Sequence, residues 1–177
     1  MSAPSAQTGL TPAWDEAVRD IPEGGIERDR AASPEELSAL AGILEVLAVK
    51  ALRAVYRIRP AGNGRYALSG RLEASLEQAC VVSLEPLTRR IEQAFAAAFW
   101  PAEQMLDPDS GAVDLGDEPE PEPIEHGRLP VGRLVFETLA ASFDPFPRAD
   151  GAVLDWSPPP DEAERASPFA ALAKLKK

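Results

Sequence analysis

The sequence predicts an α+β fold in which helices pack on a long antiparallel β-sheet. Apolar residues repeat at helical spacing up to residue 48 and at every second position from residue 49, and such a change of period separates a helix from strands. A Gly-Asn-Gly turn at 62–64 interrupts the alternation, which is typical of a hairpin. We therefore expect helices near 34–48 and 130–142 and a long meander over about 49–100.

Short elements are expected before the first helix. Residues 1–12 are small and polar, with prolines, and predict a disordered lead-in. Residues 14–21 and 25–30 predict two short strands around a Pro-Glu-Gly-Gly turn. The helix begins after Ser33, because serine caps free N–H groups and Glu36 completes a capping box. Its apolar face is expected to hold Leu37, Leu40, Ala41, Leu44 and Leu47.

The alternating runs predict a sheet with one apolar face and one wet face. The third run, residues 87–100, is rich in alanine, which leaves a helix open, but aromatic residues at odd positions favour a strand. The apolar face is expected to contain Leu52, Ala54, Tyr56, Ile58, Tyr66, Leu68, Leu72, Leu76, Leu87, Ile91, Phe95 and Phe99.

In the second half of the chain, Pro-rich segments alternate with segments that we expect to be ordered. Asp, Glu and Pro dominate residues 107–125, and such a stretch repels itself and buries little, so we expect a mobile acidic loop. A second helix follows. These features predict a single domain over 13–157, followed over 158–177 by a proline spacer and a helical tail.

Composition narrows the class of protein. The net charge of −11 argues against a general nucleic-acid binder, yet residues 48–100 carry 8 basic and 4 acidic groups. A single cysteine rules out an internal disulfide and a zinc site built on several thiolates. We expect no cofactor or metal and no small-molecule substrate.

The sequence has no long apolar run and no signal-peptide pattern, so we expect a cytoplasmic protein without a membrane partner.

A basic surface is the main candidate for a binding site. Alternation places five arginines on the wet face of the sheet, where guanidinium groups can bind phosphate oxygens. The simpler interpretation is an ordinary solvated face, partly neutralised by Glu73, Glu77 and Glu92. The five residues are Arg53, Arg57, Arg59, Arg71 and Arg90.

Cys80 raises the alternative of a cysteine-dependent enzyme. A catalytic thiolate needs a base, and the only histidine, His126, lies in the acidic loop. Acidic neighbours are expected to raise the pKa of the thiol. We therefore interpret Cys80 as a small buried residue at the end of a strand and expect no catalytic residues.

Four segments in this order resemble the YceD-like family. Residues 70–86 are similar to a strand that runs into a Cys-x-x-Cys/Thr-Leu-x-Pro element, and 129–141 to a helix that carries a glutamate. Residues 143–148 resemble a proline-rich step, and 167–175 a C-terminal signature. The matching motif positions are Cys80, Ser83, Leu84, Glu85, Pro86 and Glu137.

The resemblance implies a role in the synthesis, processing or accumulation of large-subunit (23S) ribosomal RNA. Many relatives carry a second motif cysteine that could bind a metal, but Ser83 stands at that position here. We therefore expect a non-enzymatic ribosome biogenesis factor that binds this RNA or a precursor particle. The alternative is an adaptor whose acidic segment holds a basic ribosomal protein.

Overall fold

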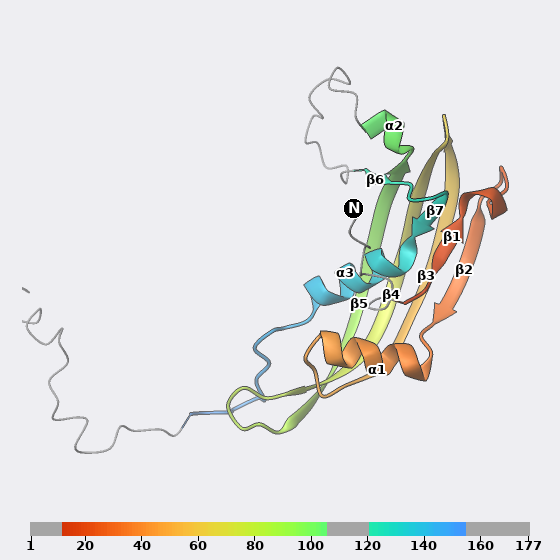
Figure 1. Ribbon diagram of the computed structural model, residues 1–177. Helices are drawn as coiled ribbons and strands as arrows, with labels where there is room; N and C mark the ends of the chain where they lie inside the picture. Colours follow the sequence, from red (N-terminus) through yellow and green to blue (C-terminus); the bar gives the residue numbers. More distant parts are fainter. Residues whose placement is uncertain (1–11, 106–120, 155–177) are drawn as a thin grey trace, which may run out of the picture.

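The computed structural model describes residues 12–105 and 121–154, which form one long, curved sheet and a smaller one (Figure 1). The strand order in the large sheet is β2-β3-β4-β5-β6, and only β6 runs parallel to its neighbour, β5. Within these ranges no helix is long and apolar enough to cross a membrane. The large sheet consists of β2 (Ile26–Ala31), β3 (Ala48–Gly62), β4 (Arg65–Ala79), β5 (Pro86–Trp100) and β6 (Glu122–Pro123).

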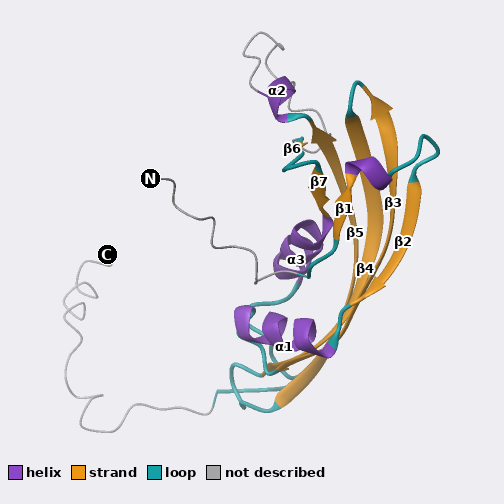
Figure 2. Ribbon diagram, turned by 45° about the vertical axis from the view of Figure 1, so that its right-hand side comes forward, coloured by secondary structure: helices purple, strands orange, loops and turns teal. Residues whose placement is uncertain are grey.

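The covering elements lie on one side of the large sheet. Figure 2 shows helices α1 and α3 and the small sheet of β1 and β7 on the concave side, while no described α-helix covers the convex side. The predicted α+β class is confirmed. These elements are β1 (Asp15–Ala17), η1 (Val18–Asp20), α1 (Pro34–Ile43), α2 (Ala102–Met105), β7 (Arg128–Pro130) and α3 (Val131–Ser142).

The meander follows the predicted alternation. Residues at even positions are buried from Leu52 to Ile58 of β3 and, apart from half-buried Gly70, from Leu68 to Gln78 of β4, and those between them are exposed or half-buried, because successive side chains of a strand point to opposite faces. β5 is a strand, which confirms the prediction over the helical alternative, and its buried residues Ile91, Phe95, Ala97 and Phe99 all lie at odd positions. Asn63 and Gly64, with φ of 51° and 73°, form the two-residue hairpin turn that the right-handed twist of strands favours.

The first helix is shorter than predicted. Its start is confirmed, since Ser33 Oγ accepts from Glu36 N at 3.2 Å and Ser33 N donates to the Glu36 carboxylate at 2.8 Å. The helix ends at Ile43 rather than near residue 48. Glu45 takes a left-handed conformation, φ 53°, which turns the chain into β3. As a result Leu47 is 57% exposed instead of lying on the apolar face.

Two other predictions need correction, and three predicted segments lie wholly or mostly outside the described residues. The strand expected over 14–21 is limited to β1, followed by a 3₁₀ turn, and β1 pairs with β7 rather than with the next strand. The acidic segment was expected to remain a loop to residue 125, but β6 lies within its last part. The lead-in 1–11, the acidic residues 106–120 and the tail from 155 lie outside the described residues.

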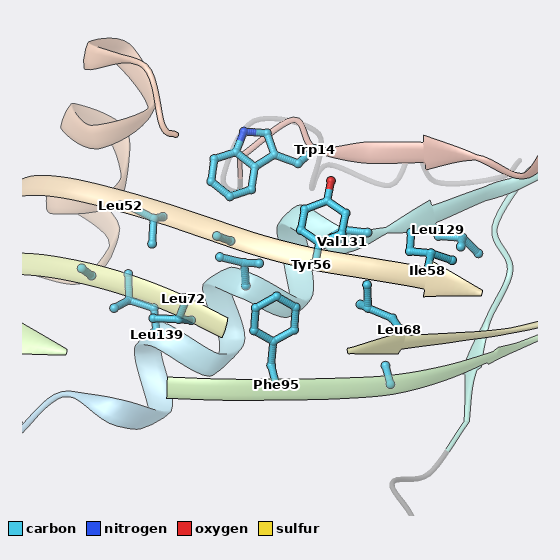
Figure 3. Packing of buried hydrophobic residues seen from close by; sticks show 14 of the residues in the cluster. Trp14, Leu52, Tyr56, Ile58, Leu68, Leu72, Phe95, Leu129, Val131 and Leu139 are labelled. Carbon is cyan, nitrogen blue, oxygen red and sulfur yellow. The ribbon is translucent and has the colours of Figure 1, made fainter. Parts of the chain in front are cut away.

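The hydrophobic core fills the concave side. Figure 3 shows side chains of β3, β4 and β5 pointing at α3 and the N-terminal segment. Gly70 makes this packing possible, because a Cβ there would come within 2.7 Å of both Tyr56 and Phe95. The Phe95 ring and the Tyr56 Cβ therefore leave room only for glycine at this position.

A buried carboxylate fastens the N-terminal segment to the core. Glu16 of β1 is 5% exposed, and the Tyr56 hydroxyl donates to it at 2.7 Å. Arg30 and Arg28 lie 3.2 Å and 3.4 Å from the same oxygen. Burial, followed by the hydrogen bond to Glu16, raises the pKa of Tyr56. Strands β1, β2 and β3 thus meet at one satisfied polar cluster.

Gly70→Ala is expected to lower the free energy of unfolding by about 1–3 kcal/mol, because the added methyl group overpacks the core. Urea denaturation measures the change. Gly42→Ala is the matched control, since nothing lies within 4 Å of its Cβ position and alanine favours a helix. Equal stability of the Gly70 variant and wild type would contradict the packing described.

Glu16→Ala is expected to cost about 1–3 kcal/mol, because it leaves the buried Tyr56 hydroxyl without its acceptor. Asp15→Ala on the same strand removes only an exposed pair with Arg128 at 3.5 Å and is expected to cost under about 1 kcal/mol. Chemical denaturation of both variants tests this difference. Losses of the same size in both would show that the buried cluster has no special role.

Candidate nucleic-acid interface

The structure places the five predicted arginines on the convex face, but in different surroundings. Arg53, Arg57 and Arg59 follow one another on β3, as predicted. Arg71 of β4 lies opposite Val55, between the rows of Arg53 and Arg57. Arg90 lies opposite Ser75, which is four residues, or about 13 Å, along β4 from Arg71.

Two of these arginines have carboxylate partners on β2. Arg53 binds Asp29 through two hydrogen bonds of 2.8 Å and 2.6 Å, and the hydrogen bond lowers the pKa of Asp29. Arg57 lies 3.4 Å from Glu27, yet its Nε atom is buried and has no acceptor in the described chain. The positive charge of Arg53 is therefore largely neutralised, while Arg57 keeps an unused donor.

Arg59 and Arg71 make no ion pair with the described residues. Arg59 lies opposite Ala67, and Arg71 lies between Val55 and Ala94. A shallow hollow beside Arg71 is lined by Arg53, Val55, Arg71 and Glu73. Both guanidinium groups are thus available to an anion.

Arg65 also belongs to this face and was not singled out from the sequence. Its guanidinium lies 3.8 Å from the centre of the Trp100 ring, and its Nε donates to Gln104 at 2.6 Å. A cation over an indole ring is held by the ring's negative face. Its outward orientation could have been predicted, since Arg65 continues the alternation of the outward positions 67, 69 and 71.

These residues define an arginine-rimmed patch. Its floor consists of short side chains, and in this part of β3, β4 and β5 no carboxylate lies on the convex face. Glutamates occur in the other half, around Glu73, Glu77 and Glu92. The patch comprises Arg57, Arg59, Arg65 and Arg71 around Ala67, Ser69, Ala94, Ala96 and Ala98.

Cys80 lies at the end of β4 and is fully buried, as expected. Its sulfur accepts N–H groups from Val82, Ser83 and Ala149 at 3.3–3.4 Å. Hydrogen bonding from Ser83 above all, then from Ala149 and Val82, lowers the pKa of the thiol to about 6. The expectation that acidic neighbours raise this pKa was wrong, because the Ser83 side chain and the backbone N–H groups of Ser83, Ala149 and Val82 hydrogen-bond to the sulfur.

Four other motif positions lie in or next to the turn between β4 and β5. Glu85 accepts the N–H of Cys80 at 2.8 Å through its carbonyl, and Leu84 N donates to Cys80 O at 2.9 Å. Ser83 Oγ accepts from Glu85 N at 3.4 Å, and Pro86 begins β5. These contacts close the turn between β4 and β5.

Glu137 is exposed on α3 and belongs to a cluster around Arg133. The Arg133 guanidinium lies 2.6 Å from Glu122, 3.9 Å from Glu125 and 3.9 Å from Glu137. Arg133 therefore joins the end of the acidic segment to α3. Within the described ranges, no three His, Cys, Asp or Glu residues are grouped so that they could hold a metal ion.

The lowered pKa of Cys80 predicts a pH dependence of stability. The folded thiol has a pKa near 6, below the ordinary value of about 8.5 for an unfolded chain. The stabilisation is therefore complete above the unfolded pKa and is lost as the pH falls through 6. Relative to Cys80→Ala, wild type is expected to gain stability from pH 6 to pH 9 in urea denaturation. A pH-independent difference would show that the sulfur stays protonated.

The comparisons with known proteins agree with the resemblance read from the sequence. The family model described as large ribosomal RNA subunit accumulation protein YceD matches residues 68–176. This range includes all four segments quoted above. No curated protein and no solved structure was found to match. Because the family model covers more than half of the chain, this protein belongs to the YceD family of large ribosomal RNA subunit accumulation proteins.

Proposed function

We propose that this protein is a non-enzymatic, cytoplasmic ribosome biogenesis factor that binds precursor large-subunit RNA, alone or in an assembling particle, through the arginine-rimmed patch. Membership of the family supports involvement in large-subunit RNA accumulation. The single observation that carries the finer proposal is the patch itself, where four arginines surround short side chains on the uncovered face of the sheet.

The chemistry of the patch suits a nucleic-acid backbone. Guanidinium groups bind phosphate oxygens through paired hydrogen bonds, and Arg59 and Arg71 have no carboxylate partner in the described chain. Alanine and serine between them let a backbone approach the sheet without steric obstruction. The Arg65–Trp100 pair adds a ring and a guanidinium plane beside the patch, on which unpaired RNA bases can stack.

The overall negative charge does not prevent such binding. The chain carries −11, but interactions between exposed charges are largely screened beyond about 8 Å at physiological salt. A local cluster of cations therefore determines short-range attraction. We expect affinity to fall steeply with salt, as for other phosphate contacts.

The two alternative functions receive less support. An adaptor for a basic protein depends on residues 107–125, and of these the described Glu122 and Glu125 already contact Arg133. An enzyme that uses Cys80 would need its sulfur to reach a substrate, whereas that residue is fully buried. In the patch, by contrast, Arg59 and Arg71 are exposed and have no carboxylate partner among the described residues.

The combined change Arg59→Glu and Arg71→Glu is expected to weaken RNA binding about tenfold or more and to lower the salt slope by about 2. These two arginines are chosen because their reversal breaks no described ion pair. Binding of a precursor 23S RNA fragment at several salt concentrations measures the effect. Co-sedimentation with precursor particles measures it in cells.

The matched control reverses Arg19 and Arg148 to glutamate, which changes the net charge equally outside the patch. It is expected to bind RNA much like wild type, and both double variants should keep their thermal stability within about 0.5 kcal/mol. Wild-type binding and co-sedimentation by the Arg59 and Arg71 variant would exclude the patch as the interface.

A further inference from the structure

The two edges of the large sheet differ in how well they are protected. β2 has only 6 residues and presents Arg28, Asp29 and Arg30. β5 has 15 residues, and on its outer side it pairs with β6 only at Phe99 and Trp100. In the part of the chain that the structure describes, no strand lies beside residues 86–98 on that side (Figure 1).

The outer edge of β5 carries Arg89, Arg90 and Glu92 but lacks the other features that prevent strand addition. Long exposed edges are usually interrupted by prolines, bulges or many charges. The pairing of β4 with β5 contains no register shift, unlike that of β3 with β4, and the one proline, Pro86, is the first residue. Helix α3 packs on β5 from the concave side (Figure 2), out of the plane in which a strand would be added.

Two charges at this edge lack partners. Glu92 lies directly opposite Glu73 of β4, and like charges in that position repel each other. Arg90 lies opposite Ser75. Neither Arg90 nor Glu92 forms an ion pair within the described residues. An added strand that offered a cation to Glu92 and a carboxylate to Arg90 would satisfy both.

A second copy of the same strand meets this requirement. Two antiparallel β5 strands related by a two-fold axis perpendicular to the sheet keep their convex faces on the same side. With the axis at Ile91, Arg90 of each copy lies opposite Glu92 of the other, and Leu87 lies opposite Phe95. Axes at residue 90 or 92 would instead bring like charges together.

We infer that the edge of β5 is a self-association site, through which two copies join their five-stranded sheets antiparallel about Ile91. The two Arg90–Glu92 pairs set the register. The two convex faces then form one surface. This inference stands on the sheet edge and its charges and does not depend on RNA binding.

Sedimentation equilibrium of the full-length protein without RNA tests the inference. Wild type is expected to dimerise reversibly. Glu92→Arg is expected to raise the dimer Kd about tenfold or more, because two attractive cross-strand pairs become repulsive. Adding Arg90→Glu restores opposite charges, and this double variant is expected to return to within about threefold of wild type.

Glu23→Arg is the matched control, since it makes the same charge change in the exposed 22–25 turn, away from β5, and should leave the dimer Kd nearly unchanged. Hydrogen exchange of residues 87–96 should slow as protein concentration rises, and circular dichroism checks that each variant is folded. A protein that stays monomeric at about 0.2 mM would overturn the proposal. So would a dimer that Glu92→Arg leaves intact, or one that the double variant fails to restore.

Discussion

Burial of one face of the β3–β5 meander is the constraint on which the rest of the structure depends. The three strands are long, and their inward side chains need a cover to leave water. Helices α1 and α3 and the small β1–β7 sheet provide it, all from the concave side (Figure 2). Because these elements all lie on the concave side, no helix of residues 12–105 and 121–154 covers the convex side.

Two local features make this one-sided arrangement possible. Gly70 lets Tyr56 and Phe95 approach each other across the sheet, and Tyr56 in turn donates to the buried carboxylate of Glu16. That carboxylate also faces two arginines of β2. The N-terminal strand, the edge strand and the centre of the core are therefore coupled, since a buried polar group needs all of its partners.

The RNA interface that we propose on the convex face depends on how charge is distributed in the sheet. Carboxylates on β2 neutralise Arg53 and contact Arg57, whereas Arg59 and Arg71 stand among short side chains. On the convex face, carboxylates therefore lie on β2 and around Glu73, Glu77 and Glu92. Arg59 and Arg71, which have no carboxylate partner among the described residues, lie between these two groups. At the β5 edge, Arg90 and Glu92 form no ion pair with the part of the chain that the structure describes.

The sequence by itself determined the strands, the hairpin turn, the start of α1, the extent of α3 and the outward side of five arginines, because these follow from local spacing along the chain. Family membership was also readable from its motifs. Only the tertiary structure decided that α1 ends at Ile43, that Asp29 neutralises Arg53, that Arg65 stacks on Trp100 and that three N–H groups surround Cys80. The physical reason is that a local pattern fixes where a side chain points, whereas its partners come from distant segments that only the folded chain brings together.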